Sequence, residues 1–574
     1  MAVQLVVLLL QQPSQAWRVC DVTDDEFGAV GNGITKATAS IRAALTKCDE
    51  VWLPRGHSFL SGPLNLTSNQ VLRVDGTLLA STDKHDYPLV APLMGYGWGD
   101  DENCFDPSLD KHKIIVGSLR YSPVIGAFHA KNVTITGAGT IDGQGAIWWQ
   151  NCTKCHYPPN NDPSFCLVAS RPKLIETQYV DGFRVLGAKS TTPLRQPPGM
   201  EKCRVTTVAD FVLSTSHAVP GVHGAYDAFT PHSGAWDKHV GAFCGDNKQV
   251  HTHAPIAFSS DAVSLDECQH HCTALNCTCF DFLSAKPPSP APAPPQPDWS
   301  RTLTLQNSPF WTLTPSYTQN IHVRDLRILA PMDRIGNTDG VNLDSCRNAL
   351  VENIWIRNSD DGVCIKSGLN GFGLNLAVPT ENVLIRNITC PEGGRGGFAL
   401  GSEMSGGMRN ITYRDSILHG ERGIHIKPSV GRGGYMRDVL FENIITRRTS
   451  INMGHDGQTL MPANNYVPLI SNLRFANISG GCNFGGCASA NRSQCFNLTV
   501  VGSGPHCRAP ASEDLPPQRY SCKRVAHTMF GVVDLPWPVC IPLDAPVNLR
   551  PDYPNWGPMA GNYTSIEACR AACV

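Results

Sequence analysis

The amino-acid sequence predicts an all-β solenoid, a stack of short coils, because alternating apolar runs recur along it. Each run is opened by an asparagine or aspartate, and successive runs are 28 or 34 residues apart. The six openings are Asn320, Asn348, Asn382, Asn410, Asp438 and Asn472. A repeat of this length with period-2 strands indicates coils that are each too small to bury a core alone.

The composition supports the same fold class. The 574 residues include 52 glycines and 43 prolines, and only 17% are charged. These proportions are typical of a turn-rich β protein. The formal net charge of −2 gives no electrostatic reason to bind nucleic acid or an anionic membrane, so we expect neither as a partner.

The first segment, residues 1–16, is interpreted as a secretory signal, with a trimmed or misread N-terminus as the alternative. It contains the apolar run Val3–Leu10 and ends in the small-x-small site Ser14-Gln15-Ala16, but no Lys or Arg precedes the run. The 23 cysteines fit an oxidising compartment, and their odd number leaves at least one thiol unpaired. Glycosylation sequons add to this prediction of secretion, among them Asn65, Asn132, Asn387, Asn410 and Asn477.

Residues 17–187 are predicted to form an N-terminal cap and the first coils. Apolar residues at helical spacing over Thr35–Cys48 follow a Gly-rich turn, which predicts a short amphipathic helix. Such a helix would cover the open end of the solenoid and protect its strand edge.

Residues 188–302 are predicted to be a Cys-rich insertion that interrupts one coil. Leu174–Val185 has the pattern of a coil whose continuation, Leu303–Tyr317, follows only after this stretch. The insertion ends in the Pro-rich segment Ser284–Ser300, which is typical of a polyproline II spacer. Its scattered histidines are interpreted as solvated loop residues rather than a metal site.

The coils resume over residues 303–480, and residues 481–574 form a second Cys-rich region. We interpret this region as a disulfide-held tail that covers the far end of the solenoid. Its last residues, Ser565–Cys573, repeat the Ser-x-x-x-Cys-x-x-x-Cys pattern of Ser264–Cys272 in the insertion, so they predict a partial copy of the same module.

Three aspartates are the candidate catalytic residues. Asn337-Thr338-Asp339-Gly340 is followed slightly less than one repeat later by Ser359-Asp360-Asp361-Gly362. Neighbouring coils lie about 4.8 Å apart, so these side chains are expected to meet on one face. Asp, Asn and Gly are also common in turns for structural reasons, but two such motifs one coil apart favour chemistry. Carboxyl groups roughly 6.5–9.5 Å apart suit glycoside hydrolysis with inversion.

These motifs resemble those of the polygalacturonase family of glycoside hydrolases, which cut pectin. Besides the aspartates, Gly401-Ser402-Glu403 and His425-Ile426-Lys427 match family regions, and GSEMSGGMRNI and VGRGGYMRDV are similar to its plant-type branch. The resemblance covers about residues 20–187 and 303–480. It implies a right-handed parallel β-helix, a pectin-lyase-like solenoid, with no cofactor and no metal. Ser264–Cys272 and the cysteines after it are similar to apple or PAN modules.

The resemblance also implies roles for individual residues. Asp360 would be the general acid, while Asp339 and Asp361 would hold and deprotonate the attacking water. The residues expected to bind substrate are Asn337, His425 and Lys427. The implied substrate is the α-1,4-galacturonan of pectin, so we expect an extracellular or cell-wall protein. We also expect a monomer whose insertion is available to bind a glycan or protein partner.

Two departures from the family pattern keep other functions open. Gly396 stands where the family often has a histidine, although the similar plant-type branch lacks it too, and His425 stands where the family has an arginine. Histidine is charged only in acid, so the second change affects substrate affinity more than chemistry. The first alternative is a catalytically impaired glycan-binding or adhesion protein. The second is a pectate lyase, which would need calcium and an arginine base. The sequence does not distinguish exo from endo action, or a plain galacturonan from a modified backbone.

Overall fold

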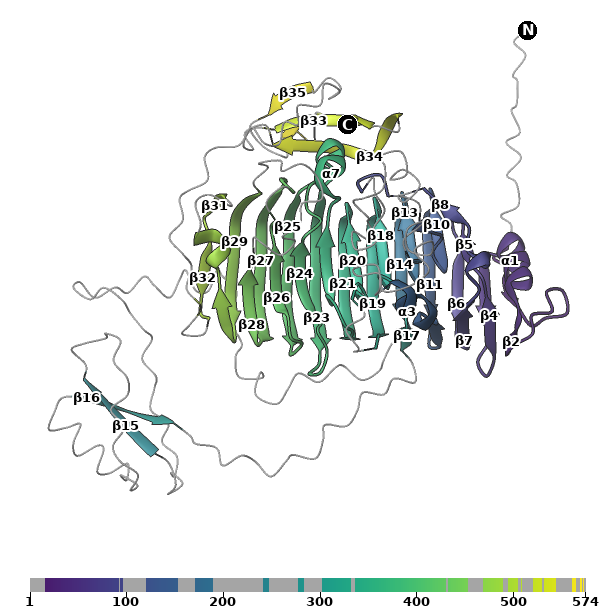
Figure 1. Cartoon of the computed structure of the whole chain (residues 1–574), viewed down its shortest axis with the longest axis horizontal. Coiled ribbons are helices and arrows are strands. Elements are labelled where there is room, and N and C mark those ends of the chain that lie inside the picture. The colour runs from purple at the N-terminus through teal and green to yellow at the C-terminus, as the bar shows by residue number, and fades with distance from the viewer. Residues whose placement is uncertain are drawn as a thin grey trace, which may run out of the picture. The chain divides into compact units, whose positions relative to one another are not determined.

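Parallel strands stacked side by side form the body of the chain in the computed structural model (Figure 1). The structure describes residues 16–91, 93–96, 120–152, 171–188, 241–246, 277–282, 302–331, 336–429, 432–452, 468–488, 494–503, 507, 520–528, 531–542, 560–563, 568–569 and 571. Every strand pair within the two large sheets is parallel, so the predicted solenoid is a parallel β-helix.

The larger sheet contains 18 strands. They are β1 (Val19–Asp21), β2 (Asn32–Lys36), β3 (Glu50–Leu53), β4 (Ser58–Ser61), β6 (Val71–Val74), β7 (Thr77–Ala80), β11 (Lys131–Gly137), β12 (Thr140–Asp142), β14 (Asp181–Gly187), β17 (Leu303–Gln306), β19 (Gln319–Leu329), β21 (Arg347–Arg357), β23 (Thr380–Cys390), β25 (Met408–Leu418), β27 (Tyr435–Thr446), β29 (Leu469–Ile478), β31 (Gln494–Phe496) and β32 (Thr499–Val501).

The second sheet contains 10 short strands, one per coil. They are β5 (Leu64–Leu66), β10 (Ile125–Phe128), β13 (Ile175–Gln178), β18 (Leu313–Ser316), β20 (Val341–Asp344), β22 (Val363–Lys366), β24 (Gly397–Gly401), β26 (Gly423–Lys427), β28 (Arg448–Ile451) and β30 (Gly481–Asn483). This sheet carries the candidate site.

The asparagines that open the repeats form a ladder of side-chain amides along the stack. Asn348 donates through Nδ2 to Oδ1 of Asn320 at 3.2 Å, Asn382 to Asn348 at 3.1 Å, and Asn410 to Asn382 at 2.8 Å. All four have φ between 52° and 58°, a left-handed conformation that asparagine tolerates better than most residues. The sequence repeat therefore follows from one requirement, a left-handed turn that also donates to the coil before it.

A second ladder marks the bend within each long strand. β19 pairs with β14 before Asp325 and with β17 after it, and Asp325 has φ of 57°. Asn353 donates to Asp325 at 3.2 Å, and Asn387 donates to Asn353 at 2.7 Å. Each long strand thus contributes to two faces of the coil, with a left-handed residue at the corner.

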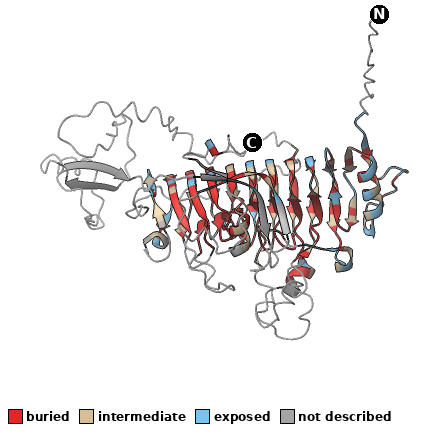
Figure 2. Ribbon diagram, turned by 90° about the horizontal axis from the view of Figure 1, so that it is seen from above, coloured by how far each residue is buried: buried red, intermediate tan, exposed pale blue. Residues whose placement is uncertain are grey.

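The core fills with the apolar residues of the alternating pattern, as the buried inner strands in Figure 2 show. Aromatic rings stack between coils at the same spacing as the strands. The ring centroids of Tyr413 and Phe441 are 5.0 Å apart, as are those of Phe441 and Phe475, and both pairs are nearly parallel. Stacked identical positions therefore give a continuous core through the solenoid.

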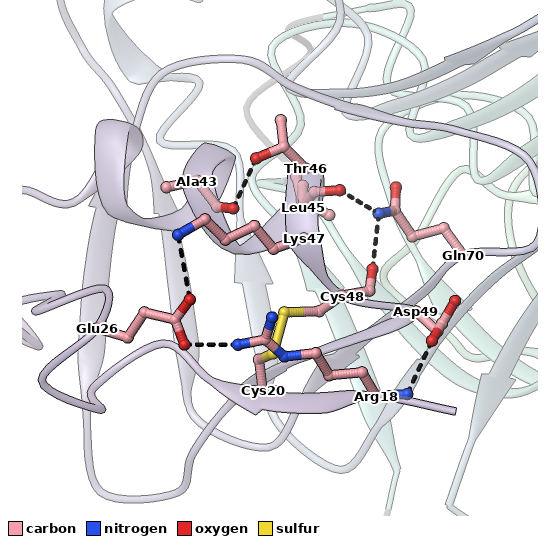
Figure 3. The surroundings of a disulfide bond; sticks show 10 residues. All are labelled: Arg18, Cys20, Glu26, Ala43, Leu45, Thr46, Lys47, Cys48, Asp49 and Gln70. Carbon is pink, nitrogen blue, oxygen red and sulfur yellow. Dashed lines mark hydrogen bonds and ion pairs between the residues drawn. A yellow bond between two sulfur atoms is a disulfide. The ribbon is translucent and has the colours of Figure 1, made fainter. Parts of the chain in front are cut away.

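The first coil is closed by the predicted helix, which is α1 (Thr38–Lys47). Its apolar face buries Ile41, Ala44 and Leu45. A disulfide between Cys20 and Cys48 ties the end of the helix to β1 (Figure 3). Nearby, the Gln70 side-chain amide donates to the backbone oxygen of Leu45 at 2.5 Å and of Cys48 at 3.2 Å, which satisfies carbonyls at the helix C-terminus.

The C-terminal strands do not lie where the sequence analysis expected. β33 (Tyr520–Thr528), β34 (Gly531–Pro542) and β35 (Ala560–Tyr563) form an antiparallel sheet. Trp537 and Val539 of β34 pack with Leu376 and Val378, next to α7 (Asn370–Leu376) of the middle coils. The expectation that this region covers the far end is wrong for β34, because its buried Trp537 anchors it against the middle coils (Figure 1).

The remaining described elements are short. They are α3 (Ala146–Cys152), η1 (Lys84–Asp86), η5 (Gly485–Ala488), β8 (Leu89–Val90), β9 (Arg120–Tyr121), β15 (Gly241–Asp246) and β16 (Cys277–Phe282). Disulfides join Cys482 to Cys507 and Cys487 to Cys495 at the last coil, and Cys540 to Cys569 in the C-terminal strands. Three described cysteines are free thiols, all buried: Cys346, Cys364 and Cys390.

Most of the predicted insertion and nearly all of the predicted signal lie outside the described residues. Residues 194–297 separate from the rest of the chain as their own compact unit, in which β15 and β16 pair antiparallel. The histidines and the Ser264–Cys272 pattern of the insertion are not among the described residues. Within the described part of the chain, no helix is long and apolar enough to cross a bilayer.

Deleting residues 194–297 and joining the ends with a short linker should leave the solenoid folded. Strands on either side already pair, since Phe183 of β14 lies opposite Ile321 of β19, and Ile141 of β12 lies opposite Leu305 of β17. Urea unfolding followed by circular dichroism should remain one cooperative transition. A control deletion of β19 should abolish it, and equal behaviour of the two deletions would contradict this account.

Candidate active site

The candidate site lies where β20, β22 and β26 of the 10-stranded sheet begin. Asp339 comes two residues before β20, and Asp361 two residues before β22. The strands are in register, with Val341 opposite Val363, and the N–H of Gly340 donates to the backbone oxygen of Asp361 at 3.0 Å. The two aspartates therefore stand on equivalent positions of adjacent coils, as the sequence predicted.

Asn358 holds the two aspartate segments together from beneath. Its side-chain amide donates to the backbone oxygen of Thr338 at 2.9 Å and to that of Asp361 at 2.7 Å. The hydroxyls of Thr338 and Ser359 are 2.7 Å apart and bond to each other. All three side chains are buried, so these bonds fix the backbone that carries the carboxylates.

Asp360 is bound by two backbone amides. The N–H of Asn337 donates to Oδ2 of Asp360 at 2.9 Å, and the N–H of Asp361 donates to Oδ1 at 2.9 Å. The Asn337 side chain in turn accepts a hydrogen bond from Arg171 at 3.1 Å. Asn337 therefore acts on the carboxylates through its backbone, while its side chain is held by a cation.

Three basic side chains contact the carboxylates. Lys427 Nζ lies 2.6 Å from Oδ2 of Asp361, and Arg422 Nη1 lies 2.9 Å from Oδ1 of Asp361 and 2.5 Å from Oδ1 of Asp360. Lys366 Nζ is farther from Asp339, at 3.6 Å, because it pairs with Glu403 at 2.7 Å. Asp360 and Arg422 are partly buried, and the other residues of this group are buried.

Burial and these cations move two carboxyl pKa values in opposite directions. Burial raises the pKa of Asp339 to about 7, with a further rise from the charges of Asp360 and Asp361 and only partial opposition from Lys366. Burial acts on Asp361 in the same sense, but Lys427, Arg422 and Lys366 outweigh it and hold the pKa of Asp361 well below its usual range. The site thus contains an ionised carboxylate beside a carboxyl group that stays protonated in acid.

The other predicted binding residues lie on β26. Lys427 faces Asp361, as described above, so in this structure its charge is engaged by a catalytic candidate. His425 is buried and lies in register with Ala399 of β24 and Ser450 of β28. Gly396, at the position of the family histidine, is buried, and a Cβ there would lie 2.6 Å from Asn358 Oδ1 and 3.6 Å from Gly362 Cα.

Sequence reasoning missed Arg422 and Asn342. Arg422 precedes a Gly-apolar pair at the start of a strand, the same place that Asp339 and Asp361 occupy, so the strand-opening pattern could have revealed it. Asn342 lies in register with Cys364, and neither of its amide atoms has a hydrogen-bond partner within the described structure although it is buried. No local sequence signal distinguishes Asn342 from other strand residues.

A metal ion is poorly suited to these carboxylates. Ligand atoms of Asp339, Asp361 and Cys364 lie within 4.8 Å of one another. However, Lys427 already contacts Asp361 and Lys366 approaches Asp339, and burial raises the pKa of the Cys364 thiol well above its ordinary value. A divalent cation would have to displace two ammonium groups, so this donor set does not favour the calcium chemistry of a lyase.

The fold is a parallel β-helix whose adjacent coils bring carboxyl groups together, and comparison with known proteins shows which proteins it is similar to. Residues 300–486 match the model of "Glycosyl hydrolases family 28", and this stretch spans all three aspartates, Arg422 and Lys427. The match covers this stretch and not the larger part of the chain.

Individual proteins resemble the chain over longer stretches. A probable polygalacturonase of Vitis vinifera is 28% identical over 426 residues, which are 72% of this chain but 58% of that protein, so the chain spans little more than half of this relative. Two solved structures share the fold. An exopolygalacturonase from Thermotoga maritima has a TM-score of 0.50 at 20% identity and covers 85% of this chain and 86% of its own. A family 28 exopolygalacturonase of Yersinia enterocolitica has 0.51 at 13%, over 85% and 72%.

Replacing Asp339 by asparagine should stabilise the fold at pH 8 more than at pH 4. The folded-state pKa of Asp339, about 7, exceeds its ordinary value near 4, so the stability it contributes is present below about pH 4 and lost as pH rises through 7. The slope of this loss is about 1.4 kcal/mol per pH unit. Urea unfolding of both proteins at the two pH values measures the difference.

Asp438→Asn is the matched control. Asp438 belongs to the ladder of residues that open the repeats, here called the outer ladder, and its carboxylate accepts a hydrogen bond from the Asn472 side-chain amide. A gain from Asp339→Asn that is the same at pH 4 and pH 8 would contradict the raised pKa of the buried carboxyl.

Proposed function

We propose that this chain hydrolyses the α-1,4-galacturonan of pectin, as a glycoside hydrolase that inverts the anomeric centre. The observation that carries the proposal is the set of three aspartates on adjacent coils, held by buried hydrogen bonds inside the stretch that matches glycosyl hydrolases family 28. Names of similar proteins support it, since the Vitis vinifera relative is a probable polygalacturonase.

The proposed chemistry divides the two proton transfers between neighbouring residues. Asp360 donates a proton to the leaving glycosidic oxygen as the bond to the anomeric carbon breaks. Water attacks that carbon from the opposite face and gives its proton to a carboxylate. Asp361 suits this second role because nearby cations keep it ionised, whereas Asp339 with its raised pKa suits binding and orienting the water.

Basic residues beside the aspartates support a uronate substrate. Lys427 and His425 share β26, and the substrate carboxylate would compete with Asp361 for Lys427. Asn337 is proposed to bind substrate as well, next to Asp360. A uronate carboxylate could pair with Lys427, whereas a neutral polysaccharide could not, so polyuronates are favoured.

Further proposals concern the protein as a whole. We infer that it is secreted to the cell wall or extracellular space. The buried disulfide Cys20–Cys48 supports secretion because disulfides persist in oxidising compartments. We also propose that the protein is a monomer. The unit of residues 194–297 is proposed as a separate module for a glycan or protein partner.

One observation favours the second candidate function, a glycan-binding protein with impaired catalysis. Arg422 and Lys427 are ion-paired to the aspartates themselves rather than left open for substrate. The proposed hydrolase must therefore exchange these partners when a uronate binds.

The experiment that separates these functions is incubation of purified protein with polygalacturonate. Reducing ends are measured together with absorbance from unsaturated products, with and without EDTA. Hydrolysis predicts reducing ends, no unsaturation and no effect of EDTA. Unsaturated, EDTA-sensitive products would indicate a lyase, and binding to immobilised polymer without any cleavage would support the adhesion function.

Asp360→Asn should lower kcat by about 10²–10⁴-fold, since the amide keeps the shape of the side chain but cannot supply the proton. Thermal unfolding of the variant shows whether the fold is intact. Asp438→Asn, an identical change in the outer ladder, should keep wild-type kcat. An Asp360→Asn protein that retains more than about half of wild-type kcat would exclude the acid role.

A further inference from the structure

Four consecutive coils share one register position, which lies two residues before the first apolar residue of a short strand. In each coil a glycine follows this position. The registers of β20, β22, β24 and β26 run Val341, Val363, Phe398 and Ile424, with Gly397 opposite Gly423. The four equivalent positions are occupied in order by Asp339, Asp361, Gly396 and Arg422. Arg422 is therefore separated from Asp361 by one coil, whose residue at this position has no side chain.

The Arg422 side chain spans the coil that carries Gly396. Arg422 reaches across that coil, and its Nη1 contacts Oδ1 of Asp360 and Oδ1 of Asp361. The backbones of the two coils are joined, because the N–H of Arg422 donates to the oxygen of Arg395 at 3.2 Å. A long side chain on one coil thus serves two carboxylates on the coil beyond its neighbour.

Arg422 is the contact that fixes the aspartate pair relative to each other. Asp361 Oδ2 is bound by Lys427, and Asp360 Oδ2 by the N–H of Asn337, but these donors each serve one carboxylate. Among the described side chains, Arg422 alone donates to both. Its guanidinium is mostly shielded, with 14% of the side chain exposed, so the pairing is stronger than at an open surface.

A larger residue at position 396 would disturb the same arrangement. A Cβ there would lie 2.6 Å from Oδ1 of Asn358, whose amide holds the backbones of Thr338 and Asp361. Any side chain would push against this clamp. Glycine at 396 and arginine at 422 therefore both support the segment that carries Asp360 and Asp361.

We propose that Arg422 is the positioning residue for Asp360 and Asp361, and that Gly396 leaves room for the Asn358 side chain that clamps the segments carrying the aspartates. This inference rests on the proposed hydrolase function for its role in turnover, but the pairing itself can be tested without activity. Arg422 acts by orienting two carboxylates, so its loss should affect kcat more than KM.

The test compares Arg422→Gln, Arg422→Lys and Gly396→Ala on polygalacturonate. Arg422→Gln should lower kcat by about 10²-fold, the scale of one lost electrostatic contact in a site, with KM changed by less than about threefold. Arg422→Lys should recover part of kcat, since it keeps the positive charge but on a different side chain that does not reproduce the position of Nη1. Arg395→Gln and Gly394→Ala are matched controls in the adjacent turn, where Arg395 pairs with Glu421 and a Cβ at 394 meets only ordinary contacts.

A double variant separates the two positions. Gly396→Ala disturbs the Asn358 clamp and not the contacts of Arg422, so it should lower kcat by about the same factor in the wild-type and Arg422→Gln backgrounds. A Gly396→Ala loss that disappears in the Arg422→Gln background would overturn the proposal. So would an Arg422→Gln protein with wild-type kcat, or one whose loss falls entirely on KM.

The pH profile supplies a readout that a purely structural role would not move. Asp361 is faced by Lys427, Arg422 and Lys366 and by the acidic groups of Asp339 and Asp360, with the Cys364 thiol nearby. Removing one cation should raise the pKa of Asp361, so the acidic limb of kcat/KM should shift to higher pH in Arg422→Gln. An unmoved limb would contradict the proposal.

Stability against pH separates this inference from the proposed function. If the wild type cleaves no uronate polymer, the hydrolase proposal fails, yet the pairing still predicts that Arg422→Gln lowers the urea midpoint more at pH 7 than at pH 3. The sign follows because the pKa of Asp361 is lower in the folded state than in the unfolded state. Such a carboxyl group stabilises the fold when the pH is above its unfolded-state pKa, and this contribution is lost as pH falls through the folded-state pKa. Equal losses at both pH values would show that Arg422 does not hold the carboxylates.

Discussion

Direct stacking of equivalent residues from coil to coil is the constraint on which the rest of this structure depends. It is enforced at the corners, where Asn348, Asn382 and Asn410 each use one side-chain amide to bind the coil before them while adopting a left-handed turn. Because strands are about 4.8 Å apart, whatever a coil carries at one position meets the same position of its neighbours. Rings then stack on rings, and carboxylates on carboxylates.

Stacked like charges are destabilising, and in the site Asp339 and Asp361 differ in how closely cations approach them. Asp361 has an ammonium group at 2.6 Å and a guanidinium at 2.9 Å, whereas the nearest cation to Asp339 is 3.6 Å away and shared with Glu403. Both carboxyls are buried, so the difference of about 1 Å in ion-pair distance, and in the number of partners, decides which one ionises. Adjacent coils thereby place an ionised carboxylate beside a carboxyl group that stays protonated in acid, both from the same type of residue.

The sequence was sufficient for the parts of the structure that repeat. Asparagines at regular spacing announce the ladders, and Asp339 and Asp361 fall one coil apart because the repeat places them so. It was insufficient where the contact is long-range and occurs once. Nothing local to Trp537 indicates that it packs against Leu376 and Val378, and a match by family motif drew attention to His425 instead of Arg422 three residues earlier. Arg422 occupies the same register position as Asp339 and Asp361, so the repeat predicts basic as well as acidic residues of the site.

The pairing of β14 with β19 has a consequence for how the chain folds during synthesis. β14 ends at Gly187, but β19, which pairs with β14, and β17, which pairs with β12, begin only after the unit of residues 194–297 has been made. At about 5–20 residues per second, the ribosome needs on the order of 5–20 s to make that stretch. During this interval the N-terminal coils, closed at their other end by α1, present an unpaired parallel edge. The nascent N-terminal part, up to Gly187, is therefore the form of this protein most exposed to strand addition by other chains, and chaperone binding would matter most at that stage.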